Sequence, residues 1–159
     1  MKRETLFLKI VVFLIGIPIL GLCIVILPEL AGFYAKLLPN MAYLQYPFLI
    51  ILYATAIPFF FALYQTLKLL SYIDKNIAFS ELSVKALKSI KYCAVSLSML
   101  YVLVLPFLYL LADADDAPGL IVLGLVVIFA SMVVAVFAAV LQKLLKNAID
   151  IKEENDLTV

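Results

Sequence analysis

Few side chains of this sequence could do chemistry, and those few are scattered. The 159 residues include no histidine and two cysteines, Cys23 and Cys93, which stand far apart. The usual zinc sites group cysteine, histidine and carboxylate ligands, so they cannot be assembled here. Hydrolytic chemistry needs a positioned acid, base, nucleophile or metal, and the apolar runs offer only hydroxyls and thiols without a base. We therefore expect no catalytic residue, no metal site and no cofactor.

One acidic cluster invites comparison with a calcium loop. Asp113, Asp115 and Asp116 lie close together in the sequence. A calcium loop requires glycine at its sixth position and glutamate at its twelfth, but counting from Asp113 places Pro118 and Gly124 there. We interpret the cluster as a solvated acidic turn that helps to fix the topology of the chain.

The elements that carry these residues are set by an apolar composition. Hydrophobic residues make up 67% of the chain, charged residues 14%, and the mean hydropathy is +1.18. A soluble domain is about 45–50% apolar and about 25% charged. This composition excludes a soluble enzyme, a disordered tail, a coiled coil and a disulfide scaffold, and it predicts an integral membrane protein.

Four long uncharged stretches predict four membrane-spanning helices. They lie between Lys9 and Glu29, Lys36 and Lys68, Lys91 and Asp113, and Asp116 and Lys143. A charge near the bilayer centre costs at least about 2.5–3.5 kcal/mol, so spans lie in such stretches. None alternates as a barrel strand would. We predict an all-α four-helix bundle forming a single membrane domain over residues 1–159, with spans at about 10–27, 47–69, 93–111 and 119–141.

Basic residues predict the orientation of the bundle. Of the 12 lysines and arginines, only Lys36 falls in a predicted outer loop. The other basic residues precede the first span, lie in or beside the loop 71–92, or belong to the tail 142–159. By the positive-inside rule, both termini are expected in the cytoplasm.

Small residues and prolines within the spans indicate how the helices meet. Prolines at 18, 58 and 106 predict kinks; a transporter with broken helices is one interpretation, and ordinary bending is the favoured one, because few polar groups lie at that depth. Small residues spaced every fourth position predict close helix packing, within the bundle or with a second copy in a homo-oligomer. These residues are Ala94 and Ser98 in the third span and Ser131, Ala135 and Ala139 in the fourth; the prolines are Pro18, Pro58 and Pro106.

The first outer loop predicts a short interfacial helix. Between Pro28 and Asn40, apolar residues including Phe33 and Tyr34 fall on one helical face, and Pro28 suits a first helical turn. Tyr34 is also expected to anchor the chain at the outer membrane surface, since tyrosine concentrates at membrane interfaces.

The loop 71–92 predicts a basic amphipathic helix that leads into the third span. Ser80 is expected to cap it, and an apolar stripe of Leu82, Ala86, Leu87 and Ile90 alternates with Lys85, Lys88 and Lys91. These lysines are expected to contact anionic lipid headgroups or a cytoplasmic partner.

The C-terminal tail offers a second contact for a partner. Its last residues, which include Asp156, Leu157 and Val159, could enter a binding groove as an extended peptide with a free carboxylate. The fourth span is expected to continue as a helix past the membrane through Ile149, and a frayed polar end is the favoured interpretation of the residues after it.

A family resemblance rests on two of these segments. The stretch Ala78-Phe79-Ser80-Glu81 leading to Val84, Leu87 and Ile90, together with the tail Glu154-Asn155-Asp156-Leu157-Thr158-Val159, resembles the YoaS-like family of small four-span bacterial membrane proteins. Members are often encoded beside a Cro/CI-type helix-turn-helix regulator. The resemblance implies a bacterial plasma membrane location and a cytoplasmic regulator as partner, and it implies no catalytic residues.

Two functions follow as hypotheses. The first is a non-enzymatic membrane protein that binds a cytoplasmic protein such as a transcription regulator, without itself contacting nucleic acid. The second is a small transporter, channel or peptide-immunity protein. Beyond the lipid bilayer, the expected partners are therefore anionic lipid headgroups, a regulator, and a second copy of the chain.

Overall fold

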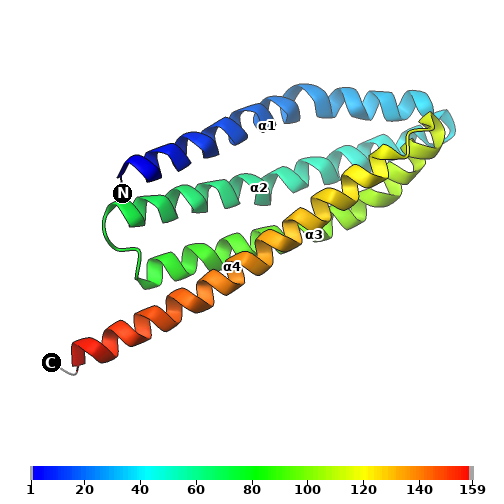
Figure 1. Cartoon of the computed structure of the whole chain (residues 1–159). Coiled ribbons are helices and arrows are strands. Elements are labelled where there is room, and N and C mark those ends of the chain that lie inside the picture. The colour runs from blue at the N-terminus through cyan, green and yellow to red at the C-terminus, as the bar shows by residue number, and fades with distance from the viewer. Residues whose placement is uncertain (1, 158–159) are drawn as a thin grey trace.

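The computed structural model describes residues 2–157 as four long helices (Figure 1). The elements are α1 (Lys2–Leu37), the short 3-10 helix η1 (Pro39–Leu44), α2 (Gln45–Asp74), α3 (Glu81–Asp115) and α4 (Gly119–Leu157). This part of the chain contains no strand, and four of its helices are long and apolar enough to cross a membrane. The predicted all-α, four-span fold is confirmed.

Both tight turns between long helices use a residue in the left-handed backbone conformation. Asn76 follows α2 with a φ of 61°, and Asp116 follows α3 with a φ of 51°. Short polar side chains tolerate this conformation better than other non-glycine residues. The backbone N–H of Ala117 then donates to the carbonyl of Ala112 at 2.9 Å, which satisfies an acceptor that the end of α3 leaves open.

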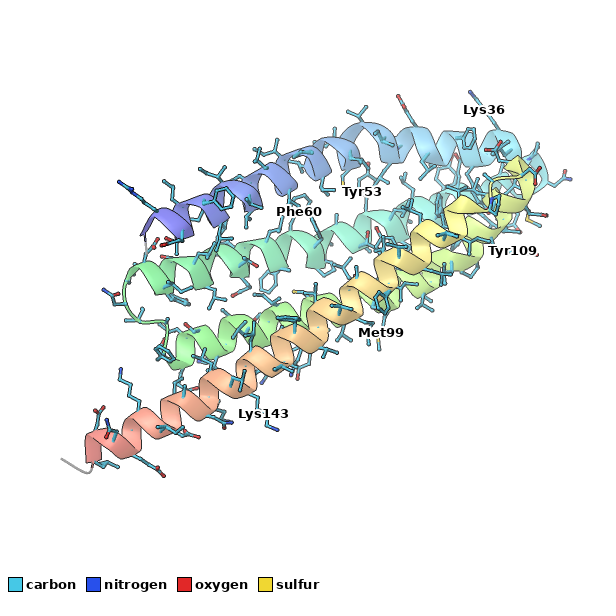
Figure 2. The ribbon with its side chains drawn as sticks, viewed as in Figure 1. Lys36, Tyr53, Phe60, Met99, Tyr109 and Lys143 are labelled. Atoms are coloured by element: carbon cyan, nitrogen blue, oxygen red, sulfur yellow. The ribbon has the colours of Figure 1, made fainter. Side chains whose placement is uncertain are left out.

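The helices pack in sequence order. α3 contacts α2 and α4 extensively, whereas α1 contacts mainly α2. Figure 1 shows both termini and the loop 75–80 at one end of the molecule, which we call the terminal end, and η1 with the α3–α4 turn at the other, the loop end. Figure 2 places Lys36 at the loop end.

An aromatic cluster forms the core of the loop end. Tyr34 and Phe48 are completely buried, with ring centroids 5.4 Å apart, and Phe107 lies 5.4 Å from Phe48 and 6.4 Å from Tyr34. Val104 and Leu111 of α3 complete the buried centre of this cluster. Three helices are therefore joined here by close ring contacts.

This core corrects the prediction for residues 28–40. Pro28 lies inside α1, which continues to Leu37, so the segment is helical but is not a separate interfacial helix. Proline removes only one backbone donor, whereas leaving the helix would expose several peptide groups to hydrocarbon. The hydroxyl of Tyr53 also donates to the Cys23 carbonyl, in the turn before Pro28, at 2.9 Å. Tyr34 is a core residue, not an interfacial anchor.

The burial of Tyr34 leads to a prediction about its hydroxyl. Its oxygen is buried without a hydrogen-bond partner in the described structure, and burying an unpaired hydroxyl costs about 1–3 kcal/mol. Tyr34→Phe should therefore keep or raise the thermal midpoint in detergent. Tyr53→Phe, which loses the hydrogen bond to the Cys23 carbonyl, should lower the thermal midpoint. A lower midpoint for Tyr34→Phe than for Tyr53→Phe would contradict the conclusion that only the Tyr53 hydroxyl is paired.

The contact between α3 and α4 follows a heptad pattern. The residues of α4 that are buried are Gly124, Ala135, Ala138 and Ile149. Gly124 and Ala138 are two heptads apart, as are Ala135 and Ile149, so all four lie along one seam of the coiled-coil type. A polar contact crosses the same seam, where the Ser98 hydroxyl donates to the carbonyl of Ile128 at 3.5 Å.

The small residues singled out in the sequence occupy this seam unequally. Ala94, Ser98 and Ala135 are buried, whereas Ser131 and Ala139 are only partly buried. A spacing of four residues drifts away from a seam with a 3.5-residue repeat, so Ala138 is buried more deeply than Ala139.

Candidate interaction surface

The first turns of α3 form the predicted basic amphipathic helix at the terminal end. Lys85 and Lys88 are exposed and Lys91 is half-buried. The apolar stripe differs from the prediction at one position, because Leu82 is 48% exposed and Ser83 is completely buried. α3 packs against two neighbouring helices, so its buried face is wider than a single stripe and includes Ser83.

The cap of α3 also differs from the prediction. Ser80 stands at the N-cap in an extended conformation, but its hydroxyl donates to the carbonyl of Ile77 at 2.6 Å and accepts no helix N–H. The N–H of Ser83 instead donates to the backbone carbonyl of Ser80 at 3.1 Å. The loop 75–80 thus uses the serine hydroxyl to close its own turn.

The last turns of α4 project beyond the other helices at the terminal end (Figure 1). α4 has 39 residues and is about 58 Å long, whereas the hydrocarbon of a bilayer is about 30 Å thick. Charges begin at Lys143 (Figure 2) and continue to Asp156. The part of α4 after Lys143 therefore extends into water.

Apolar side chains remain exposed on this projecting segment. Leu144 is 59%, Ile151 65% and Leu157 86% exposed, and Phe79 from the loop 75–80 is 59% exposed. Phe79 and the Ala148–Asn155 stretch of α4 line an open groove of about 550 Å³. We call Phe79, Leu144, Ala148 and Ile151 the tail surface; Leu157 lies about 120° around the helix from Ile151 and is not part of it.

The conformation of the tail corrects another prediction. α4 remains helical through Leu157, so Asp156 and Leu157 are not part of an extended strand; Val159 lies outside the described residues. A continuous helix satisfies its backbone hydrogen bonds internally and leaves none for addition to a sheet edge. Any contact made by these residues uses a helical face. Acidic side chains at positions 150, 153, 154 and 156 are exposed around it.

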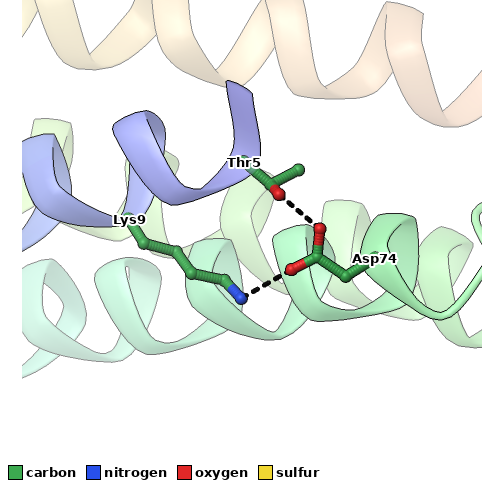
Figure 3. Close-up of polar contacts among 3 residues, drawn as sticks. All are labelled: Thr5, Lys9 and Asp74. Atoms are coloured by element: carbon green, nitrogen blue, oxygen red, sulfur yellow. Dashed lines mark hydrogen bonds and ion pairs between the residues drawn. The ribbon is translucent and has the colours of Figure 1, made fainter. Parts of the chain in front are cut away.

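The structure brings together a polar cluster at the terminal end that no sequence pattern predicts. Asp74, at the end of α2, accepts hydrogen bonds from the Thr5 hydroxyl and from the Lys9 ammonium group of α1, the latter at 2.8 Å (Figure 3). Thr5 is buried, while the side chains of Lys9 and Asp74 are 31% and 21% exposed. Residues so distant in sequence carry no shared motif, so only the register of α1 on α2 reveals their contact.

A groove lies between α1 and α4 in the middle of the molecule. Its volume is about 360 Å³, and residues from all four long helices line it, including Cys23, Thr55, Tyr101 and Ser131. The Thr55 hydroxyl is occupied by a hydrogen bond to the Leu52 carbonyl at 2.6 Å. Most of the other residues that line the groove are aliphatic or aromatic.

The three predicted kink positions lie inside helices. Pro18 is in α1, Pro58 in α2 and Pro106 in α3, and each of these helices is assigned without interruption. The unwound backbone that a broken-helix transporter would use is absent from these segments. Within residues 2–157, no three histidine, cysteine or acidic residues are grouped so that they could hold a metal ion.

These features define a multi-pass membrane protein with four long apolar helices. The chain belongs to the family described as "Protein of unknown function (DUF2975)", whose model matches residues 29–159. It is also 67% identical over 158 residues to the "Uncharacterized membrane protein YoaS" of Bacillus subtilis (strain 168), with 99% of each chain covered. The resemblance noted from the sequence is thereby confirmed. No solved structure matches the chain.

Proposed function

We propose that this protein is a non-enzymatic membrane anchor that binds a cytoplasmic protein through the tail surface, and that the partner is a helix-turn-helix transcription regulator. The single observation that carries the proposal is the exposed apolar face of Leu144 and Ile151, which lie on one side of α4 beyond Lys143, where its charges begin. Apolar residues exposed together on a surface in water typically mark an interaction site.

The distribution of charge supports a cytoplasmic position for this surface. Lys36 lies alone at the loop end, and the other basic residues belong to segments at the terminal end. By the positive-inside rule, this distribution supports a cytoplasmic position for the terminal end. Exposed carboxylates at 150, 153, 154 and 156 surround the apolar residues, so the complementary face of the partner should be apolar at its centre and basic at its rim.

Site-specific photo-crosslinking in cells tests the contact. A benzoylphenylalanine in place of Phe79 should crosslink to a DNA-binding regulator, whereas the same probe in place of Tyr109, exposed at the loop end, should not. Crosslinks from position 79 only to lipid, or only to a second copy of this chain, would contradict the proposal.

A variant pair then measures the contribution of the apolar face with purified proteins. Ile151→Asp should weaken binding of the identified regulator at least about tenfold, because it places a charge in the centre of the contact. Lys146→Ala changes the net charge by the same amount but lies about 140° around the helix from Ile151, and it should leave affinity nearly unchanged. Equal losses for both variants would show that charge, not the tail surface, controls binding.

A further inference from the structure

We propose that the groove between α2 and α3 binds one anionic phospholipid, with an acyl chain in the groove and the phosphate at Lys88 and Lys91. This inference is independent of the proposed function, because it uses no residue of the tail surface. It rests on an apolar groove within the membrane and on unpaired cations at the rim of that groove.

The groove has a volume of about 470 Å³ and is open along one side. Ile57, Pro58 and Phe61 of α2 form one wall, and Tyr92, Ser96 and Leu100 of α3 form the other. These residues belong to the uncharged stretches of their helices, and at that depth the available occupants are apolar. The groove is thus open to the lipid that surrounds the protein.

The rim of the groove carries two ammonium groups on one aromatic ring. Tyr92 lines the groove, and its ring centroid lies 4.9 Å from Nζ of Lys91 and 6.0 Å from Nζ of Lys88. Within residues 2–157 neither lysine forms an ion pair. A cation above an aromatic face keeps its full charge, so both ammonium groups are available to a phosphate.

A similar pair lies on α2, beyond the residues that line the groove. Nζ of Lys68 lies 5.3 Å from the ring centroid of Tyr64 on α2. Lys68 stands six residues before the end of α2 and Lys88 seven residues after the start of α3, so the two antiparallel helices bring these lysines to a similar height. Three cations therefore lie at the same end of the groove.

The depth of these cations matches a lipid headgroup. Lys91 is the last charge before the uncharged stretch of α3, and Lys68 is the first charge after that of α2. Both therefore mark the boundary between hydrocarbon and headgroups, with the groove on the hydrocarbon side. An anionic phospholipid has its phosphate at the depth of these lysines and its acyl chains at the depth of the groove. Each lysine near an anionic headgroup raises the binding constant by about fivefold.

Quenching of a single tryptophan by brominated lipid tests the proposal. The chain has no tryptophan, so Phe61→Trp places one reporter in the groove. The full-length protein is reconstituted in vesicles of one fixed phosphatidylglycerol and phosphatidylcholine composition. Two samples are compared: in one the brominated acyl chains belong to phosphatidylglycerol, and in the other they belong to phosphatidylcholine. The brominated fraction of the total lipid is the same in both samples. We expect brominated phosphatidylglycerol to quench the reporter more, with an apparent preference of at least fivefold.

Matched variants assign the preference to the rim. Adding Lys68→Gln, Lys88→Gln and Lys91→Gln should abolish it, whereas Lys143→Gln, Lys146→Gln and Lys152→Gln, which remove the same charge from α4, should not. A Phe129→Trp reporter, which is 72% exposed on α4, should be quenched equally by both lipids in every background, and this confirms insertion of each variant. The proposal is wrong if both lipids quench Phe61→Trp equally, if the preference survives in the Lys68, Lys88 and Lys91 variant, or if neither lipid reaches the groove because a second copy covers it.

Discussion

A leucine at position 124 is expected to disrupt the contact between α3 and α4 and to lower the thermal midpoint of the protein in detergent by several degrees. A Cβ atom on Gly124 would lie 2.8 Å from Cδ1 of Leu108 and 2.9 Å from Cδ2 of Leu105. Two leucine side chains could shift slightly for one methyl group, but not for a whole leucine. Overpacking of this kind costs about 1–3 kcal/mol, and close packing is a main source of helix association in lipid.

Gly21 supplies the matched control for this prediction. No heavy atom lies within 4 Å of a Cβ built at Gly21, so Gly21→Leu should leave the midpoint within about one degree of the original or raise it, because glycine is a poor helix former. Circular dichroism during heating, with size-exclusion profiles before and after, measures both variants. Similar losses for the two variants would show that glycine itself, not the α3–α4 contact, determines stability.

Replacing Asp74 with alanine is expected to release the N-terminal end of α1 from α2. Asp74 accepts hydrogen bonds from both Thr5 and Lys9, and α1 has few contacts with helices other than α2. Losing charge-assisted bonds costs about 1.5–3 kcal/mol, although Lys9 regains part of this by extending its side chain toward water. Amide hydrogen exchange in the first turns of α1 should accelerate at least about fivefold, since exchange reports local opening.

A charge exchange distinguishes the ion pair from a general loss of folding. The double variant Lys9→Asp with Asp74→Lys should restore most of the protection in α1, because the two charges face each other in either order. Asp113→Ala, which removes an acid at the loop end, should leave exchange in α1 unchanged. Unaltered exchange in Asp74→Ala would mean that apolar packing alone holds α1 in place.

The four spans could be predicted because the free-energy cost of a charge in hydrocarbon dominates their placement. A charge in hydrocarbon costs more than any local preference, so uncharged stretches such as that between Lys91 and Asp113 determine where the helices lie. The same argument does not set the ends of a helix outside hydrocarbon. α1 therefore continues through Pro28 to Leu37, because Tyr34 packs against Phe48 and Phe107, and these contacts depend on three helices meeting.

The candidate surface could be predicted only in part, for a related reason. Helical periodicity alone predicts that Lys85 and Lys88 are exposed. The burial of Ser83 and the pairing of Asp74 with Thr5 and Lys9 depend on the rotation and register of neighbouring helices, which a single chain pattern does not encode. The charges of the tail favour a frayed end after Ile149, but α4 is helical through Leu157, because helix propagation costs little once a long helix exists.

The serial packing of the helices limits what a single copy can enclose. In residues 2–157, α1 and α4 make no backbone approach to each other, and the space between them is the open groove that all four helices line. A water-filled conduit needs a wall on every side, and here the bilayer itself forms one of them. A solute that crossed the membrane along this groove would be in contact with lipid. A pathway closed to lipid would therefore require a second copy of the protein to cover the groove.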